Sequence, residues 1–169
     1  MSPRVVLVGP MGAGKTTVAE RLAQRWQLPV RDTDHDVEHE TGRSISDIFV
    51  DEGEAHFRAL ERTAVARALA EHDGVLSLGG GAVLDPGTRE LLADHCVVFL
   101  QVGLAEAVKR VGLGTGRPLL LGNVRARVKA LLDERTPVYT AVATHTVDTD
   151  DRDPDEVATR IIELVEETP

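Results

Sequence analysis

The chain has 169 residues, which suits a single domain with a sizeable core. Its formal net charge of −9 argues against a general nucleic-acid or membrane-surface binder, since such proteins usually present a basic face. The only cysteine, Cys96, excludes an internal disulfide, and the few residues before the first apolar run are too short for a signal peptide. We expect one domain over residues 1–169, located in the cytoplasm, without a nucleic-acid or membrane partner.

Five short apolar runs are the predicted strands, and helical patterns lie between them. The runs cover residues 5–8, 29–31, 75–78, 96–102 and 144–147. Nearly continuous apolar character is typical of strands covered on both faces, and helices between the strands imply parallel crossovers. The pattern predicts an α/β doubly wound fold with a parallel sheet.

Three positions have the features of helix starts. Asp85 and Asp153 each precede a proline, which places an aspartate at the N-cap and proline at the first helical position. Ser44 and Asp47 have the spacing of a capping box, with the shorter aspartate in place of glutamate. We therefore expect helices to begin after residues 44, 85 and 153.

A phosphate-binding P-loop is predicted at residues 9–16, between the first strand and a helical segment at 17–26. The sequence has the spacing G-x-x-x-x-G-K-T. Its glycines let backbone N–H groups surround a polyphosphate, and the following helix adds the positive end of its dipole. Lys15 is placed to reach the phosphates and Thr16 to ligate Mg²⁺. The alternative is a glycine-rich turn with an incidental lysine; the complete motif in this context favours nucleoside triphosphate binding.

Two carboxylates follow the second predicted strand, at the edge where ligands bind in open α/β sheets. Asp32 has the chemistry to hold Mg²⁺ through water, and Asp34 to accept the proton of an attacking hydroxyl. The alternative is that both cap the acidic helical segment at 35–40. Spacing alone leaves the two interpretations open.

A charged pair and a glycine run come next along the chain. Arg58 and Glu61 lie three residues apart in the helical pattern at 53–72, so they share a helix face. Without context, a solvated surface salt bridge is the favoured interpretation of this pair. The glycines at 79–81 follow a buried strand directly, which indicates close approach of backbone to another group, with a loose loop as the alternative.

A lid is predicted at about residues 112–124. Three glycines before Arg117 suit a mobile flap that carries a cation over transferring phosphates, with a disordered connector as the alternative. The stretch Glu-Arg-Thr-Pro-Val-Tyr at 134–139 places Arg135 at the predicted end of a helix.

Taken together, these stretches resemble the shikimate kinase family, and the resemblance covers nearly the whole chain. The matching segments are GPMGAGKTT from Gly9, DTD from Asp32, GRSISDIF from Gly42, GEAHFRALE from Gly53, LGGGAV from Leu78, GRPLL from Gly116, ERTPVY from Glu134 and RDP from Arg152. The resemblance implies a three-layer P-loop fold like that of nucleoside monophosphate kinases. Its five-stranded parallel sheet would have the order 2-3-1-4-5, flanked by helices.

The resemblance also implies an activity. Shikimate kinases transfer the γ-phosphoryl group of ATP to the 3-hydroxyl of shikimate, giving shikimate 3-phosphate and ADP in chorismate and aromatic amino acid biosynthesis. Mg²⁺ would be the cofactor, ATP and shikimate the small-molecule substrates, and a monomer the expected state. A substrate-binding region would lie at about 33–61.

By the same resemblance, site roles are assigned to particular residues. The ATP site would contain Gly12, Ala13, Gly14, Lys15, Thr16, Thr17, Arg110, Arg117, Arg152 and Pro154. The shikimate site would contain Asp34, Phe49, Phe57, Arg58, Glu61, Gly79, Gly80, Gly81 and Arg135. Lys15, Asp34 and Arg117 would be catalytic, with Mg²⁺ on Thr16 and, through water, on Asp32. The lid is short and glycine-rich, and only Arg117 in it matches the family pattern.

Within these assignments, the carboxylate of shikimate would be held by two arginines, Arg58 and Arg135. A guanidinium fork matches a carboxylate with two parallel hydrogen bonds, which a lysine does not reproduce. Asp34 and the Gly80–Gly81 backbone would meet the hydroxyls. Arg110 and the loop at 152–154 would flank adenine.

Two alternatives remain. Another small-metabolite kinase of the same fold, such as a gluconate or nucleotide kinase, would share Lys15, Thr16 and the lid arginine. It would not need both Arg58 and Arg135 beside the triple glycine. A nucleotide-dependent switch belongs to a different class, and the chain has no guanine-specifying N-K-x-D stretch.

Overall fold

The structure is a computed structural model that describes residues 2–115 and 121–167. All five strands join one parallel sheet with the order β2-β3-β1-β4-β5, which confirms the fold expected from the family resemblance. The strands are β1 (Val5–Val8), β2 (Val30–Asp32), β3 (Val75–Ser77), β4 (Val97–Gln101) and β5 (His145–Asp148). Each predicted run agrees with its strand to within one residue at either end.

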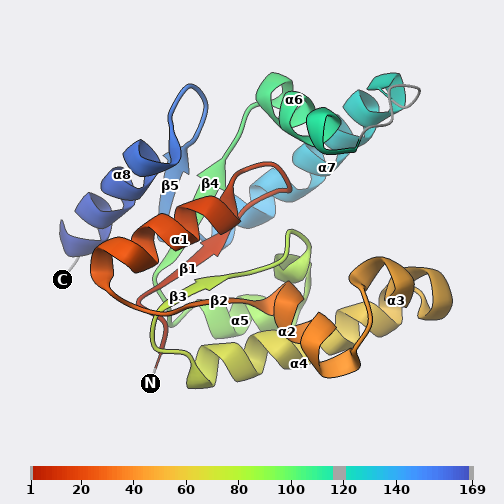
Figure 1. The fold of residues 1–169 in the computed structure, drawn as a ribbon, viewed down its shortest axis with the longest axis horizontal. Helices are drawn as coiled ribbons and strands as arrows, with labels where there is room; N and C mark the ends of the chain where they lie inside the picture. The colour runs from red at the N-terminus through yellow and green to blue at the C-terminus, as the bar shows by residue number, and fades with distance from the viewer. Residues whose placement is uncertain (1, 116–120, 168–169) are drawn as a thin grey trace.

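Helices cover both faces of the sheet (Figure 1). They are α1 (Lys15–Trp26), α2 (Thr33–Thr41), α3 (Ile45–Glu52), α4 (Glu54–Glu71), α5 (Pro86–Leu92), α6 (Leu104–Thr115), α7 (Leu121–Val142) and α8 (Pro154–Glu167), with a 3₁₀ turn η1 (Ala82–Leu84). Val5 and Leu7 of β1 share a buried cluster with residues of α1 and α8. Val6 and Val8 point the other way, into a cluster with α4, α5 and α7. Alternation along one buried strand therefore builds both halves of the core.

The predicted helix starts are confirmed by their cap geometry. The Asp85 carboxylate accepts a hydrogen bond from the backbone N–H of Thr88 at 2.9 Å, and Asp153 accepts one from Glu156 at 2.9 Å. The Ser44 hydroxyl accepts the N–H of Asp47 at 3.1 Å. Each cap satisfies a donor that the first helical turn leaves without a partner.

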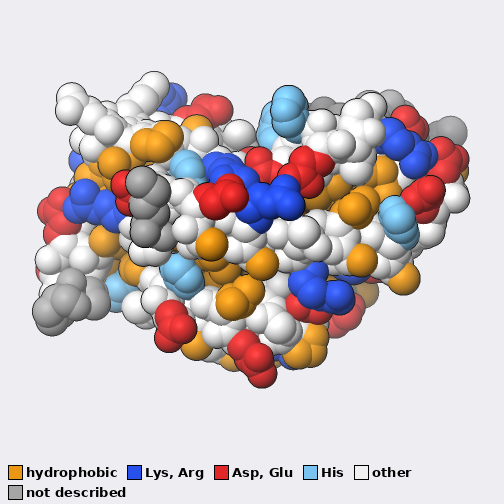
Figure 2. All heavy atoms as spheres, turned by 90° about the horizontal axis from the view of Figure 1, so that it is seen from below, with side chains coloured by type: hydrophobic (Ala, Val, Ile, Leu, Met, Phe, Trp, Pro, Cys, Tyr) orange, Lys and Arg blue, Asp and Glu red, His pale blue; other side chains and the backbone are white. Residues whose placement is uncertain are grey.

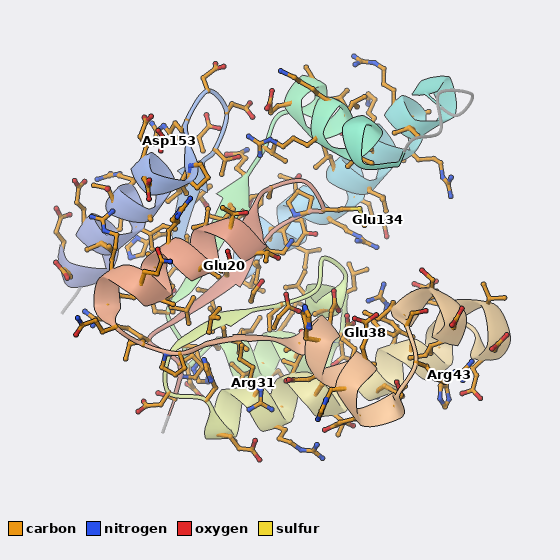
Figure 3. All side chains as sticks on the ribbon, in the orientation of Figure 1. Glu20, Arg31, Glu38, Arg43, Glu134 and Asp153 are labelled. Atoms are coloured by element: carbon orange, nitrogen blue, oxygen red, sulfur yellow. The ribbon has the colours of Figure 1, made fainter. Side chains whose placement is uncertain are left out.

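A small helical arm, formed by α2 and α3, lies beyond the carboxyl end of β2 (Figure 1). Val37 and Ile48 from this arm pack with Phe57 of α4 in a third buried cluster. Glu38 of α2, labelled in Figure 3, accepts the N–H of Ile45 at 3.1 Å, and this hydrogen bond joins the two helices. The arm therefore has its own apolar anchor on α4.

The predicted helix end at Arg135 is wrong, because this residue lies inside helix α7. The helix continues to Val142 with Pro137 inside it. Proline lacks the N–H that would bond to the preceding turn, an interruption that costs about 3 kcal/mol in an exposed helix. Here Tyr139 is fully buried and Val138 and Val142 pack on the same core cluster, so burial of the later turns offsets the missing bond.

The described parts of the predicted lid lie at its two ends. The backbone of residues 112–115 belongs to α6, and residues 121–124 belong to α7, so both ends of the predicted flap are helical. The two helices pack against one another, and this packing outweighs the low helix propensity of glycine. Arg117 lies outside the described residues.

Charges of both signs lie close together on the surface. On the face seen in Figure 2, basic and acidic side chains lie close to one another. Ion pairs such as Arg31–Asp36 join the two kinds. The net negative charge is therefore not presented on that face as one uniform acidic area. Across the described ranges, no helix has the length and apolar character needed to cross a membrane.

Candidate active site

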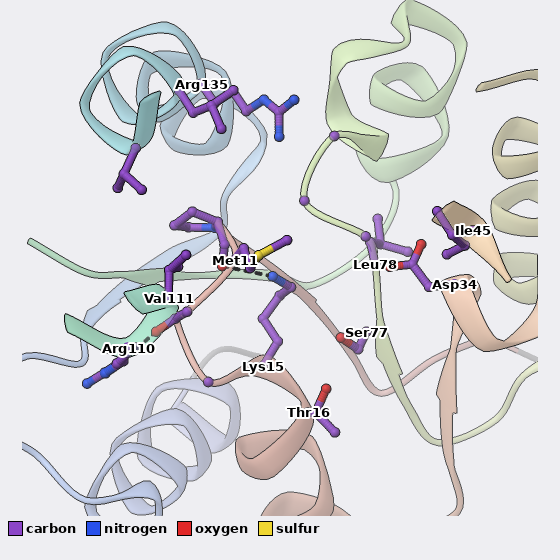
Figure 4. Close-up of a pocket in the computed structure, with 18 of the residues that line it drawn as sticks. Met11, Lys15, Thr16, Asp34, Ile45, Ser77, Leu78, Arg110, Val111 and Arg135 are labelled. Atoms are coloured by element: carbon purple, nitrogen blue, oxygen red, sulfur yellow. Dashed lines mark hydrogen bonds between the residues drawn. The ribbon is translucent and has the colours of Figure 1, made fainter. Parts of the chain in front are cut away.

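A cavity of about 1010 Å³ opens at the carboxyl ends of the central strands. Its walls come from the P-loop, the α2–α3 arm, the start of α4, the triple glycine and the inner face of α7 (Figure 4). Every residue predicted for the shikimate site lines it, namely Asp34, Phe49, Phe57, Arg58, Glu61, Gly79, Gly80, Gly81 and Arg135. The fold therefore brings together side chains that are separated by up to a hundred residues in the sequence.

The P-loop lies on the floor of this cavity. Gly12, Gly14, Lys15, Thr16 and Thr17 all line it, whereas Ala13 is buried beneath the loop. Gly14 has a φ of 87° and caps α1 without any side-chain hydrogen bond, so the first N–H groups of the helix are available to an anion.

Lys15 is held by the loop itself. Its Nζ donates to the carbonyl oxygens of Gly9 at 2.6 Å and Pro10 at 3.0 Å. Burial lowers the pKa of Lys15 to about 8, and the nearby carboxylates of Asp34 and Asp32 oppose that shift. The lysine therefore lies inside the cradle where a phosphate group would bind.

The two aspartates after β2 have different positions. Asp32 is the N-cap of α2, because its Oδ1 accepts the N–H of Asp34 at 2.8 Å and of His35 at 3.5 Å. The capping interpretation is therefore correct for Asp32. No such cap bond forms with the Asp34 side chain in the described part of the chain; its carboxylate lies against the backbone at Gly79, where an added Cβ would be 2.6 Å from Oδ1.

Burial acts strongly on Asp34 at this position. It raises the pKa of the Asp34 carboxyl, and the neighbouring Asp32 carboxylate raises it further, while Lys15 opposes the shift. Figure 4 shows Asp34 and Arg135 on opposite sides of the cavity, with Lys15 between them.

Arg58 and Glu61 form a buried pair, so the interpretation as a solvated salt bridge is wrong. Arg58 Nη1 lies 2.7 Å from Glu61 Oε1, and only 5% of the Glu61 side chain is exposed. Burial raises the pKa of Glu61, and its hydrogen bond to Arg58 opposes that shift. Beneath the guanidinium lie the rings of Phe57, at 5.3 Å, and Phe49, at 6.0 Å. This packing fixes the direction of the guanidinium.

The triple glycine is an ordered turn and not a loose loop. The N–H of Gly79 donates to Thr33 Oγ1 at 3.4 Å, and the carbonyl of Gly79 accepts the N–H of Ala82 at 3.1 Å. At Gly81 an added Cβ would lie 2.6 Å from Arg58 Nη1. A side chain at this position would therefore displace the Arg58 guanidinium from the place it occupies.

Arg135 enters the cavity from α7. Its Nη1 would lie 3.7 Å from a Cβ added at Gly80, so the guanidinium is next to the glycine turn. Its Nε is buried without a hydrogen-bond partner in the described ranges. A buried N–H of a charged group without an acceptor is costly, and an anionic ligand in the cavity would supply one.

Arg110 joins the P-loop to the turn after β5. It donates to the carbonyl of Gly12 at 2.8 Å, lies 3.1 Å from Glu106 and reaches the Thr149 carbonyl at 3.4 Å. Arg152 and Pro154 do not line the cavity: Arg152 is exposed in the turn, and Pro154 begins α8. Of the residues expected around adenine, the structure places only Arg110 in the cavity wall.

Several residues that line the cavity were not predicted from the sequence. The further lining residues include Met11, Ser77, Val111, Val124, Arg127, Val128, Leu131 and Leu132. Residues 127 and 131 precede Arg135 by multiples of four, so they share its helix face. That spacing is the signal that identifies them, because all three positions lie in the part of α7 that precedes Pro137.

Oxygen donors suited to Mg²⁺ lie beside the phosphate cradle. The Thr16 hydroxyl and the Asp32 carboxylate both line the cavity, and Mg²⁺ prefers oxygen ligands while retaining waters and substrate phosphates. These residues fit a metal that the nucleotide brings with it, with few protein ligands.

The fold and the site define a P-loop protein whose phosphate cradle opens into a second, arginine-lined pocket. The family model described as shikimate kinase matches residues 11–166. The chain belongs to the shikimate kinase family.

Individual relatives are similar to this chain over most or nearly all of its length. The shikimate kinase of Salinispora arenicola is 59% identical over 165 residues, covering 98% of this chain and 99% of the relative. That of Thermobifida fusca is 57% identical over 156 residues, covering 92% and 91%. The solved structure of the shikimate kinase from Acinetobacter baumannii in complex with shikimate has a TM-score of 0.90 and 35% identity, covering 99% of this chain and 94% of that one.

Proposed function

We propose that this chain transfers the γ-phosphoryl group of ATP to the 3-hydroxyl of shikimate, giving shikimate 3-phosphate and ADP. The observation that carries the proposal is the meeting of Arg58, Arg135 and Asp34 in one pocket beside Lys15. A P-loop alone supports nucleotide binding; the second pocket supports a small carboxylated acceptor. The complex of the Acinetobacter baumannii relative with shikimate supports this choice of acceptor.

In this proposal the two arginines bind the shikimate carboxylate. Arg58 is pre-oriented by Glu61 at 2.7 Å, and Arg135 brings a buried N–H that has no acceptor in the described ranges. Two guanidinium groups on different helices hold the ring in one orientation. Orientation matters because a positioned acceptor hydroxyl reacts far faster than a freely rotating one.

Asp34 acts on the acceptor hydroxyl. Its carboxylate lies against Gly79, within the same cavity as Arg58 and Arg135. A buried carboxylate with a raised pKa is a better proton acceptor than an ordinary aspartate. We assign it to orient the 3-hydroxyl and take its proton.

Lys15 and the P-loop N–H groups stabilise the phosphates. Phosphoryl transfer depends on positioning and charge neutralisation more than on covalent chemistry. Thr16 and, through water, Asp32 would hold Mg²⁺, which when bound neutralises phosphate charge. Arg117 is proposed as a further cation over the transferring group, within a lid at about 112–124. Arg110 and the 152–154 loop are proposed to flank adenine.

The remaining assignments concern the whole chain. One domain over residues 1–169, with a substrate-binding region at about 33–61, is supported by the single sheet to which every described strand belongs. A cytoplasmic monomer with small-molecule partners only is the state we propose. Light scattering of the purified protein, with and without both substrates, tests the monomer.

A coupled assay of ADP release with and without shikimate tests the function. Shikimate-dependent ADP formation is expected, with shikimate 3-phosphate identified by mass spectrometry. Equal ADP release without an acceptor would favour a nucleotide-dependent switch. Turnover with gluconate or a nucleoside monophosphate in its place would favour another kinase of the same fold.

The two-arginine site predicts strong discrimination for the carboxylate. The test compares kcat/KM for shikimate with kcat/KM for its carboxamide, which keeps every hydroxyl. Hydrogen bonds to charged groups contribute roughly 1.5–3 kcal/mol each, so loss of the charge is expected to cost about 10²-fold or more. Arg58→Lys keeps the charge without the fork and is expected to weaken shikimate binding while leaving ATP binding intact. Equal efficiency for acid and amide would contradict the two-arginine site.

A further inference from the structure

Tyr139 lies one helical turn after Arg135 and points into the core. The residue is completely buried, and its ring packs against Phe99 of β4 with centroids 5.0 Å apart. Its apolar neighbours include Leu78 and Val83, on either side of the triple glycine. A hydroxyl in such a cluster is stable only with a hydrogen-bond partner.

The partner is part of the acceptor pocket. The Tyr139 hydroxyl donates to the carbonyl oxygen of Gly80 at 2.6 Å, although the two residues are 59 positions apart. A Cβ added at Gly80 would lie 3.7 Å from the Tyr139 oxygen and 3.7 Å from Arg135 Nη1. The phenol and the guanidinium therefore both lie next to the central residue of the glycine turn.

The electrostatics of the phenol agree with this geometry. Burial raises the pKa of Tyr139, and a contact with the Arg135 guanidinium opposes the shift. The oxygen is thus able to accept from Arg135 while its proton goes to Gly80, which joins two elements that face the acceptor.

We propose that Tyr139 is a positioning residue for the acceptor site: its hydroxyl fixes the position of the Gly80 peptide relative to the Arg135 guanidinium. The inference rests on the proposed function, because it concerns how that same pocket is held ready for a carboxylated acceptor. Tyr139 itself does not line the cavity, so it acts through its two neighbours.

A purely structural role makes a different prediction. If the hydroxyl only satisfied a buried carbonyl, its removal would lower thermal stability and leave the kinetic constants unchanged. A positioning role changes the constants for the acceptor and leaves those for the nucleotide alone. The distinction therefore depends on kinetics and binding, not on stability.

Tyr139→Phe is the decisive variant, because it keeps the ring on Phe99 and removes one oxygen. Since small displacements of positioning groups cost up to about 10²-fold, we expect the KM and Kd for shikimate to rise by about tenfold or more. The Kd for ATP should stay within about twofold. Incorporation of 4-aminophenylalanine at position 139 restores a donor and should recover part of the shikimate affinity.

Leu69→Ala is the matched control. Leu69 lies in the same buried cluster, on α4 two turns beyond Glu61, so its truncation lowers stability without touching the pocket. It should lower Tm and leave the KM for shikimate unchanged. If Leu69→Ala raised the shikimate KM as much as Tyr139→Phe, loss of stability alone would explain the effect and the inference would be wrong.

A second measurement uses the wild-type sequence, so it does not require that a substituted variant folds. The chain contains a single tyrosine, so biosynthetic 3-fluorotyrosine labels position 139 alone. Its ¹⁹F resonance should shift on saturation with shikimate and move much less with ATP. A resonance that saturating shikimate leaves unmoved would overturn the inference.

These outcomes separate the inference from the function on which it rests. If the wild-type protein releases no ADP with shikimate, the proposed function fails. If it does, and Tyr139→Phe retains the wild-type KM for shikimate, the function stands and the positioning role fails.

Discussion

Burial acts in opposite directions on the two ionisable groups at the centre of the cleft. It raises the pKa of Asp34, whose charged form is an anion, and lowers the pKa of Lys15, whose charged form is a cation. Each shift is opposed by the other residue's charge. Both groups therefore titrate closer to neutral pH than their ordinary values, which suits a site that moves protons and binds phosphates.

At Asp34 the prediction is a loss of turnover. Asp34→Asn removes the proton acceptor but keeps the shape, so kcat should fall by roughly 10²-fold or more with little change in the Kd for ATP. Because the pKa of Asp34 is raised, the acidic limb of the wild-type kcat/KM profile should lie above the range of an ordinary aspartate. Near-normal turnover in the Asn variant would leave Asp34 without a role in proton transfer.

At Lys15 the prediction is a pH dependence of ATP binding. The lysine is a cation below its pKa of about 8 and becomes neutral above it, whereas bound phosphate favours the cation. ATP affinity should therefore fall above about pH 8, and binding at pH 8.5 should take up protons. Calorimetry in buffers with different ionisation enthalpies measures both effects.

Lys15→Arg is the control for this pH dependence. Arginine stays charged throughout the range, so any ATP binding that this variant retains should not weaken above about pH 8. An affinity of the wild type that is constant from pH 7 to 9.5, without proton uptake, would contradict the assignment.

Among the secondary-structure elements, α6 and α7 frame the cleft and carry the edges of the proposed lid. Their ends at Thr115 and Leu121 flank the segment that contains Arg117. Closure over two substrates would order the adjoining backbone. We expect amide exchange at 112–115 and 121–124 to slow when shikimate and a non-hydrolysable ATP analogue bind together, as followed by mass spectrometry.

The control for closure uses each ligand alone. Shikimate without nucleotide should protect the α2–α3 arm more than these helix ends, while amides of β1 serve as an internal reference. Exchange at the helix ends that is the same with and without both ligands would argue against a closing lid.

For the molecule as a whole, the net charge of −9 works against two anionic substrates. In the proposed acceptor site, pairing with Arg58 and Arg135 would have to overcome that field, so the binding energy would be concentrated in a few contacts. A ligand at 100 times its Kd stabilises the native state by about 2.7 kcal/mol. For a chain of this size we expect shikimate to raise Tm by about 5–10 °C.

Arg58→Lys should reduce the shift caused by shikimate and preserve the shift caused by ATP, measured by scanning calorimetry at fixed ionic strength. Equal shifts with shikimate in the wild type and the variant would show that Arg58 is not a binding residue.

Local signals predicted much of this protein. The P-loop spacing, the five apolar runs and the caps at Ser44, Asp85 and Asp153 were confirmed, because each depends on residues within a few positions of one another. The ordered set of motifs was specific enough to identify the family. The order of the strands came with that resemblance, since no periodicity specifies which strands pair.

Only the tertiary structure decided which polar groups are buried and which distant residues meet. It showed that the side chain of Asp32 caps a helix and that the side chain of Asp34 does not. It also showed that Glu61 of the Arg58–Glu61 pair is buried, although spacing alone predicted a solvated salt bridge. In the tertiary structure α7 continues past Pro137, because burial of Tyr139 outweighs the missing backbone hydrogen bond. Burial depends on what packs against a residue from elsewhere in the chain, and a local pattern does not contain that information.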